Sequence, residues 1–268
     1  MKNLILRTIF GALYVAAVVA VICTYSQYPY LFAALFSLFS FLAVREYHII
    51  ADKDSFLKWT GAAMAVIMFL TVYFSDASRK TSIICASVYA LLLIIVLVAE
   101  LFRKRQPIVN WGHTLIGQAM IAVPFAVMCM LVNHNPHMLL AMFVIIWVND
   151  TGAYCVGSLI GRHKMFVRVS PAKSWEGLVG GVVFSLVAGL IFFYTIGGYS
   201  LLQWLIIALV ISAFGTFGDL MESLLKRTIG IKDSGRFLPG HGGVLDRFDS
   251  ALLAAPALYI LLTAFSLI

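Results

Sequence analysis

Nine long apolar runs constrain this chain more than any other feature. A membrane-spanning helix needs roughly 20 mostly apolar residues, whereas the strands of a membrane barrel alternate apolar and polar residues. The runs therefore predict an all-α integral membrane protein with about nine transmembrane helices, at about residues 4–24, 28–44, 59–75, 82–102, 113–132, 137–160, 178–196, 201–221 and 250–268. The first run also resembles a signal peptide, because Lys2 and Arg7 precede it, but no small-residue cleavage site follows.

The composition agrees with a membrane protein. Hydrophobic residues make up 62% of the 268 residues and charged residues 12%. Soluble domains are about half apolar and about a quarter charged. A compact core cannot hide this much apolar surface, so the composition disfavours a water-soluble enzyme, a disordered protein and a secreted disulfide scaffold.

The basic residues predict an orientation in the membrane. With nine spans, 17 of the 19 Lys and Arg residues fall on one side, and only Arg79 and Lys80 fall on the other. Positive charge marks the cytoplasmic side, which predicts a cytoplasmic N-terminus and an external C-terminus. The two largest loops, 161–177 and 222–249, then face the cytoplasm. We divide the chain into residues 1–136, with about five spans, and residues 137–268, whose cytoplasmic loops carry the predicted chemistry.

Two carboxylates are predicted at membrane depth, where each costs about 2.5–3.5 kcal/mol and usually marks a functional site or pathway. Asp150 lies within the sixth run, and Asp219 closes the eighth. Because Asp246 opens the ninth run, we expect Asp219 and Asp246 at one membrane depth. The alternative is that Asp150 and Asp219 are packing residues, hydrogen-bonded to a neighbouring Ser, Thr or Asn.

The segment 223–249 combines carboxylates, basic residues and glycines. Asp246 and Asp249 are three residues apart and would share a helix face, as a magnesium clamp beside substrate phosphates requires. Gly242 and Gly243 let the backbone approach a ligand closely. Four basic residues could neutralise a phosphate chain: Lys226, Arg227, Lys232 and Arg247. The alternative is a solvated loop whose charges pair with one another.

Two other positions have weaker predicted roles. His241, flanked by glycines, could be an acid or base, a phosphate contact or a turn residue, but no zinc-site spacing includes it. Lys173 lies just before a span, where helix amides favour anions. Neither a P-loop nor a Rossmann fingerprint occurs in the sequence.

These residues together resemble one family. The 27-residue pattern Ser-x2-Lys-Arg-x4-Lys-Asp-x-Gly-x2-Leu-Pro-x-His-Gly-Gly-x2-Asp-Arg-x-Asp, at 223–249, is similar to the signature of phosphatidate cytidylyltransferases, also called CDP-diacylglycerol synthases. Residues 149–154 and 170–177 resemble other stretches of that family, and the likeness covers about residues 147–256. Ser174 stands where the family more often has Thr, which keeps the hydroxyl.

The resemblance implies transfer of CMP from CTP to phosphatidic acid, giving CDP-diacylglycerol and pyrophosphate. It also implies magnesium, with a second cation left open, and a homodimer in the inner (plasma) membrane with its active site facing the cytoplasm. No nucleic acid is expected as a partner. A phosphate nucleophile is already ionised at pH 7, so the reaction needs no strong general base.

We assign roles to the matching residues. Asp219 and Asp246 would hold magnesium, with Asp249 as a further ligand and Asp150 as a weaker candidate. The predicted catalytic residues are Asp219, Asp246, Lys226 and Arg247; the predicted substrate-binding residues are Lys173, Ser223, Arg227, Lys232, His241, Gly242 and Gly243.

Two other functions stay open at the level of sequence. A CTP-dependent kinase of a polyprenol or other lipid alcohol would transfer the γ-phosphoryl group and release CDP. An ion-coupled transporter would use Asp150 and Asp219 along an ion path, but it would need polar residues through several spans, and most spans have none.

Overall fold

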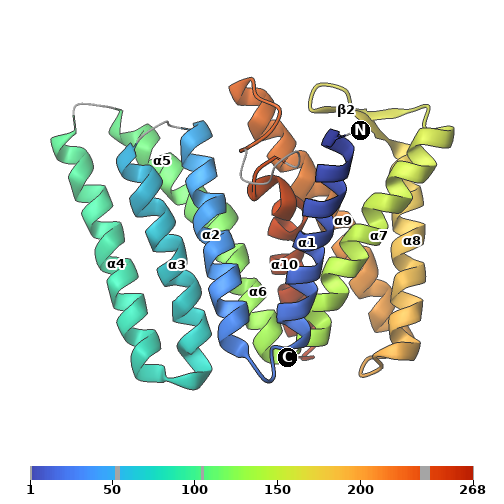
Figure 1. The fold of residues 1–268 in the computed structure, drawn as a ribbon, viewed down its shortest axis with the longest axis horizontal. Coiled ribbons are helices and arrows are strands. Elements are labelled where there is room, and N and C mark those ends of the chain that lie inside the picture. The colour runs from blue at the N-terminus through green and yellow to red at the C-terminus, as the bar shows by residue number, and fades with distance from the viewer. Residues whose placement is uncertain (1, 52–54, 104–105, 236–241, 268) are drawn as a thin grey trace. The chain divides into compact units, whose positions relative to one another are not determined.

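The computed structural model describes residues 2–51, 55–103, 106–235 and 242–267. Its elements are α1 (Lys2–Cys23), α2 (Pro29–Ala51), α3 (Ser55–Ala77), α4 (Arg79–Phe102), α5 (Pro107–Gly117), η1 (Gln118–Ala122), α6 (Val123–His134), α7 (Pro136–Ile160), β1 (Lys164–Phe166), β2 (Ser170–Ser174), α8 (Trp175–Thr195), α9 (Leu201–Ile229) and α10 (Leu245–Ala264) (Figure 1).

The prediction of an all-α polytopic membrane protein is confirmed. In the described ranges, eight helices are long and apolar enough to cross a membrane, and Thr8–Cys23 of α1 forms a shorter apolar helix. Each of the nine predicted runs is thus helical. The segment 107–134 crosses as one span although its middle is a π-helix, η1. Pro124, which follows η1, has no N–H to donate, so regular α hydrogen bonding is interrupted there.

Several predicted boundaries are wrong. Helix α2 continues to Ala51, and α9 continues to Ile229, so residues 223–229 are helical and not part of a loop. Asp219 therefore does not close the eighth span, because ten more residues of α9 follow it. Helix α10 begins at Leu245, so Asp246 and Asp249 both lie in its first turns, as their spacing predicted. The loop predicted over 161–177 contains the antiparallel pair β1–β2.

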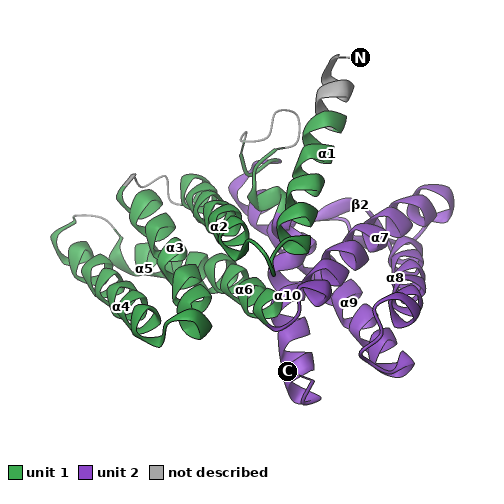
Figure 2. Ribbon diagram, turned by 60° about the horizontal axis from the view of Figure 1, so that its bottom comes forward, with its two compact units in different colours: residues 1–133, 233–247 green, residues 134–232, 248–268 purple. Residues whose placement is uncertain are grey.

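The chain forms two compact units, coloured separately in Figure 2: residues 1–133 with 233–247, and residues 134–232 with 248–268. The predicted division between residues 1–136 and 137–268 stays a prediction. In the first unit, α2 packs on α3 and α3 packs on α4. Stacked and edge-on aromatic rings fill its core; the Phe32 and Phe36 centroids lie 4.1 Å apart, and those of Phe36 and Phe125 lie 6.4 Å apart.

The second unit is built on close packing of α7 against α8, with α9 against α8. Glycines allow this approach: a Cβ added at Gly181 would lie 2.7 Å from the Asn149 side-chain oxygen. That oxygen accepts hydrogen bonds from Ser212 Oγ at 2.6 Å and from Ser185 Oγ at 3.4 Å. One buried amide thereby ties α7, α8 and α9 together beside Asp150.

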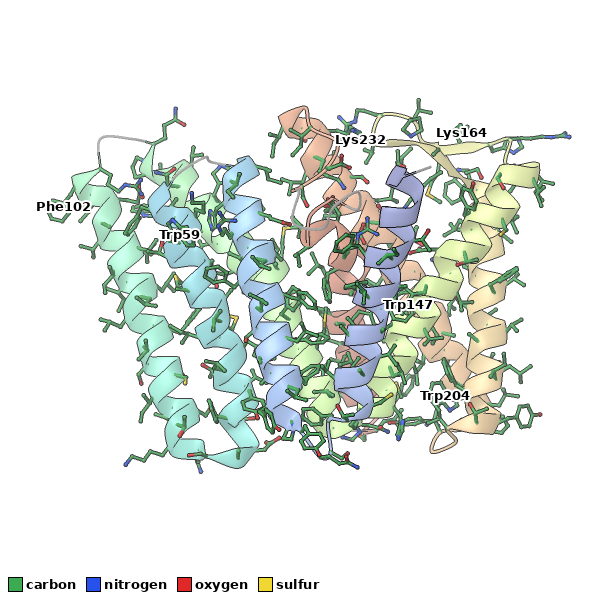
Figure 3. All side chains as sticks on the ribbon, in the orientation of Figure 1. Trp59, Phe102, Trp147, Lys164, Trp204 and Lys232 are labelled. Carbon is green, nitrogen blue, oxygen red and sulfur yellow. The ribbon has the colours of Figure 1, made fainter. Side chains whose placement is uncertain are left out.

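The polar chemistry of the second unit gathers at one end. Figure 3 shows Lys164 and Lys232 at the end of this unit opposite to Trp204. Ser174 caps α8 by accepting a hydrogen bond from the Gly177 N–H at 3.1 Å. Helix α9 ends at Gly230, which adopts the left-handed conformation with φ +79°.

Candidate active site

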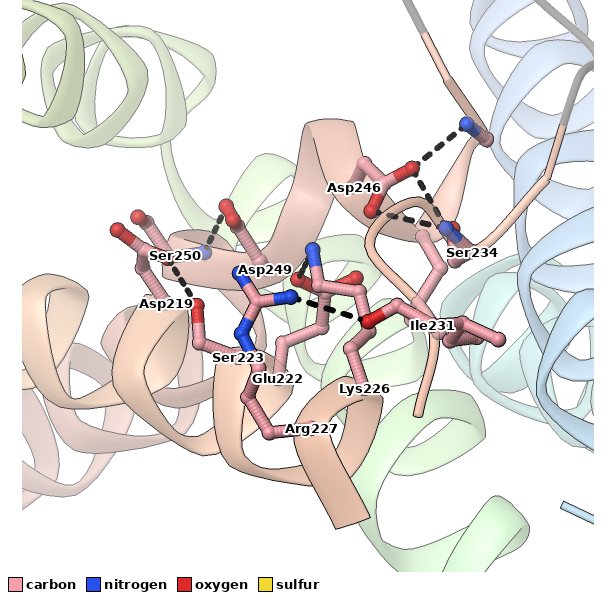
Figure 4. A network of polar contacts seen from close by, with 12 residues as sticks. Asp219, Glu222, Ser223, Lys226, Arg227, Ile231, Ser234, Asp246, Asp249 and Ser250 are labelled. Carbon is pink, nitrogen blue, oxygen red and sulfur yellow. Dashed lines mark hydrogen bonds and ion pairs between the residues drawn. The ribbon is translucent and has the colours of Figure 1, made fainter. Parts of the chain in front are cut away.

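The second unit brings Asp219, Lys173 and Ser223 together. The Lys173 ammonium, on β2, lies 2.6 Å from Asp219 Oδ2, on α9. Ser223 is one helical turn after Asp219, and its hydroxyl donates to Asp219 Oδ1 at 3.2 Å (Figure 4). The β1–β2 hairpin therefore positions the Lys173 ammonium beside the Asp219 carboxylate of α9. The sequence left open that Asp219 is only a packing residue hydrogen-bonded to a neighbouring serine. The Ser223 hydrogen bond fits that alternative, but the ion pair with Lys173 is not part of it.

Two further carboxylates face Asp219. The charge on Asp249 repels those on Asp219 and Asp150 and is attracted to Lys226, while Asp150 interacts with Asp219 and with Lys173. Gly218 allows this approach, because a Cβ there would lie 2.4 Å from the backbone oxygen of Asp249. Asp150, Asp219 and Asp249 are thus close enough within one unit to interact electrostatically, and their metal-binding roles stay predictions.

Glu222 is a site residue that the sequence analysis missed. It is buried, and it forms an ion pair with Lys226, one turn further along α9. The pair fixes the direction of the Lys226 side chain, only 12% of which is exposed. A signal was readable in the sequence, since Glu222 and Lys226 have the i, i+4 spacing of a helical ion pair.

This group holds more carboxylates than ammonium groups. Asp150, Asp219, Asp249 and Glu222 supply four carboxylates, whereas Lys173 and Lys226 supply two ammonium groups. We name these six residues the carboxylate–lysine cluster. Carboxylate oxygens are the ligands that magnesium prefers. In the ranges given above, however, no three His, Cys, Asp or Glu side chains already form a metal-binding group.

Two of the predicted phosphate-binding residues have other surroundings. Arg227 donates from Nε to the Val169 carbonyl at 3.4 Å and from Nη1 to the Ile231 carbonyl at 3.1 Å, so it joins the end of α9 to the hairpin segment. Lys232 is exposed beyond Gly230. Neither side chain lies in the carboxylate–lysine cluster, and their phosphate roles stay predictions.

In the first unit, Asp246 organises the segment that precedes α10. Its Oδ2 accepts hydrogen bonds from the backbone N–H groups of Gly243, at 2.7 Å, and Ser234, at 3.0 Å. Gly242 has φ +82°, and a Cβ there would lie 2.5 Å from Asp246 Oδ2. Gly242 and Gly243 were predicted to let the backbone approach a ligand closely. In the structure they let the backbone approach the Asp246 carboxylate. The metal-binding role of Asp246 stays a prediction.

Glu46 is a second residue that the sequence analysis missed. It lies on α2, is 6% exposed, and accepts hydrogen bonds through Oε2 from the Leu245 N–H at 2.9 Å and from Ser234 Oγ at 3.4 Å. A Cβ at Gly235 or Gly243 would lie within 2.5 Å of its carboxylate oxygens. Glu46 thus joins Ser234 and Leu245, two residues within the signature 223–249, to α2. The sequence offered little signal, because Glu46 follows the predicted run 28–44 and stands next to Arg45.

The last predicted residues are placed only in part. The backbone carbonyl of Arg247 accepts a hydrogen bond from the Tyr14 hydroxyl at 3.3 Å, and the Arg247 side chain is exposed. His241 lies outside the described residues, so its predicted roles stay open.

Comparison with known proteins assigns the family. A sequence profile described as the cytidylyltransferase family matches residues 5–265, nearly the whole chain. The chain belongs to the cytidylyltransferase family. It is therefore an enzyme, a nucleotidyltransferase, and the predicted resemblance is confirmed.

Individual relatives of this cytidylyltransferase cover most of its length. A phosphatidate cytidylyltransferase of Staphylococcus saprophyticus is 36% identical over 232 residues, which are 85% of this chain and 88% of the relative. Those of Staphylococcus haemolyticus (36% over 203 residues; 75% and 77%) and Staphylococcus aureus strain COL (35% over 210 residues; 77% and 80%) are similarly related. The similarity to these relatives therefore includes the first unit as well as the signature 223–249. The resemblance described from the sequence covered only about residues 147–256.

Proposed function

We propose that this cytidylyltransferase transfers CMP from CTP to phosphatidic acid, giving CDP-diacylglycerol and pyrophosphate. The observation that carries the proposal is the carboxylate–lysine cluster, which lies on membrane-spanning helices of a chain similar to phosphatidate cytidylyltransferases over most of its length. A lipid acceptor reaches such a site from the bilayer, and a nucleotide reaches it from water. A transporter function loses its support, because the chain belongs to an enzyme family.

The reaction joins two anions. An oxygen of the lipid phosphate attacks the α-phosphorus of CTP and forms a new P–O bond. The bond from the α-phosphorus to the oxygen that bridges it to the β-phosphorus breaks, and its electron pair leaves with pyrophosphate. Groups that neutralise the transferring phosphoryl oxygens supply most of the rate gain in such reactions. We assign this task to Lys173 and Lys226, which both pair with carboxylates, and we assign Ser223 as a hydrogen-bonding partner.

Magnesium would be held by Asp219 and Asp249, with Asp150 close by, and Asp246 remains a predicted ligand. When bound, it would balance the negative charge of CTP and of the departing pyrophosphate. The mutual approach of the three aspartates, whose carboxylate oxygens suit magnesium, supports this assignment, and a second cation has no separate support. Until substrate binds, Lys173 partly neutralises Asp219, so the lysine can turn to an incoming phosphate once a divalent cation is present.

The test uses purified protein with phosphatidic acid and CTP labelled separately at the α- and γ-phosphates. We expect the α-label to enter lipid and the γ-label to leave as pyrophosphate, both only with magnesium. Entry of the γ-label into a lipid alcohol would instead assign the kinase reaction. Failure of both labels to move in folded protein would refute the proposed activity.

We further propose an inner (plasma) membrane location, a homodimer, a cytoplasmic N-terminus and a cytoplasmic active site. The asymmetry of the basic residues supports the orientation, and the family resemblance supports the location and the dimer. Labelling of single cysteines placed at position 79 and at position 164, from outside intact cells, tests the orientation: position 79 should react and position 164 should not.

A further inference from the structure

A large groove lies on the second unit between α7 and α8, which run side by side in Figure 1. Its volume is about 1010 Å³. The lining comes from the last turns of α7, the residues that lead into β1, and the first turns of α8. Residues used in the argument below are Val156, Ile160, Arg162, Lys164, Trp175 and Val183.

Polarity changes along the groove in one direction. Basic residues and Trp175 line its mouth, at the ends of the two helices, and aliphatic side chains such as Val156 and Val183 line its depth. Trp and basic residues are typical of the membrane–water interface. Eight residues separate Trp175 from Val183, which is about 12 Å along a helix, close to the ~15 Å hydrocarbon depth of one leaflet. The groove therefore matches one lipid, with its headgroup at the mouth and its acyl chain below.

The mouth of the groove carries net positive charge. Glu176, its one acid, is engaged: its carboxylate pairs with His163 Nδ1 at 2.5 Å and accepts the backbone N–H groups of Arg162 and His163 at 3.2 Å. Arg162 and Lys164 are exposed, and in the described parts of the chain neither side chain forms an ion pair. Two basic side chains above an apolar slot complement a phosphodiester above an acyl chain.

The groove is separate from the reacting groups. Its lining includes no member of the carboxylate–lysine cluster. Lys173, the cluster residue nearest in sequence, directs its ammonium to Asp219 instead. A headgroup held by Arg162 and Lys164 would therefore not be the one that reacts.

From these observations we propose that the α7–α8 groove binds an anionic phospholipid of the bilayer, which stays bound and is not consumed by the reaction. The basic mouth selects an anionic headgroup over a zwitterionic one. Each Lys or Arg near a membrane surface strengthens binding of anionic lipid by about fivefold, so the two together should contribute about thirtyfold.

The experiment places the full chain in nanodiscs of phosphatidylcholine with a small, varied fraction of phosphatidylglycerol that carries a photoreactive acyl chain. After illumination, labelled peptides from residues 150–190 are quantified by mass spectrometry. The test variants are the double variant Arg162→Gln/Lys164→Gln, and Val183→Trp, which fills the slot at an exposed position. The matched control is Arg79→Gln/Lys80→Gln, an exposed basic pair on α4.

We expect the double variant to need about thirtyfold more phosphatidylglycerol for half-maximal labelling, and Val183→Trp to lower the maximum. The control should match the wild type, and none of the three variants should change turnover of short-chain phosphatidic acid in neutral micelles by more than about twofold. Equal labelling by a phosphatidylcholine probe, or unchanged labelling in both test variants, would overturn the proposal. So would competitive displacement of the label by phosphatidic acid together with a higher KM in the double variant, because the groove would then belong to the reacting lipid.

Discussion

Replacing Glu46 by glutamine tests whether α2 positions Ser234 and Leu245, the residues of the signature 223–249 that Glu46 contacts. The Glu46 carboxylate accepts hydrogen bonds from the Leu245 and Val244 N–H groups and from the Ser234 hydroxyl, while the Asp246 carboxylate repels it. Glutamine keeps the size but removes the charge and offers a donor to one side. Hydrogen bonds to a charged group contribute about 1.5–3 kcal/mol and those to a neutral group about 0.5–1.5 kcal/mol. The substitution should therefore weaken the attachment by about 1–2 kcal/mol.

An attachment weaker by this amount lowers the equilibrium constant for holding Ser234 and Leu245 on Glu46 by about fivefold to thirtyfold. Because Leu245 opens α10 directly before Asp246, we expect kcat to fall, by no more than this factor. The assay is steady-state turnover of phosphatidic acid and CTP in mixed micelles, with the folded fraction measured in parallel by thermal unfolding. Glu46→Asp, which keeps the charge but is shorter, should recover part of the loss.

Glu100 provides the matched control. Among the described residues of the first unit, it is the other acid that is similarly buried, at 2% exposed. Its carboxylate pairs with Arg103 at 2.6 Å and accepts a hydrogen bond from Asn110 Nδ2 at 2.7 Å. Glu100→Gln should destabilise the fold about as much as Glu46→Gln but leave kcat per folded molecule unchanged. If both variants lowered kcat equally, or if Glu46→Gln left it unchanged, Glu46 would have no role beyond stability.

Three further predictions concern the second unit. Lys173→Met should lower kcat by more than a hundredfold and raise the KM for CTP, because Asp219 loses its cation; Lys173→Arg should keep part of the activity, as steady-state kinetics would report. Gly181→Ala should destabilise the protein by about 1–3 kcal/mol, since the new Cβ meets Asn149, whereas Gly112→Ala, with open space around it, should not lower the unfolding temperature. Chelation of divalent cations should abolish CMP transfer, magnesium should restore it, and Asp219→Asn should raise the magnesium concentration needed, measured by titration.

The membrane architecture was predictable because it follows from one strong physical requirement. A helix in hydrocarbon must be apolar over roughly 20 residues, and every predicted run is helical. Helix ends were predicted less well, because nothing requires a helix to stop where its apolar run stops. Helix α9 continues past Asp219 to Ile229, where its polar residues contact the hairpin segment. The left-handed Gly230, after Lys226 and Arg227, was a readable stop signal.

The sequence could predict that Asp150 and Asp219 interact with other polar groups, because carboxylates at membrane depth are costly and usually pair with such groups. The contacts of Glu46 were not, since its partner Leu245 is 199 residues away along the chain. Periodicity and spacing describe neighbours within one helix, whereas this contact depends on how distant segments pack. Glu46 was visible in the sequence only as an unexplained acid after Arg45.

The same limit applies to the pair Asp246 and Asp249. Their spacing of three residues predicts a shared helix face, and they do share the first turns of α10. Their partners nevertheless differ. Asp246 accepts hydrogen bonds from the Gly243 and Ser234 backbone N–H groups and is repelled by the Glu46 carboxylate, whereas Asp249 is repelled by Asp219 and Asp150 and attracted to Lys226. Each aspartate thus belongs to a different group of carboxylates, a distinction that depends on packing and not on spacing.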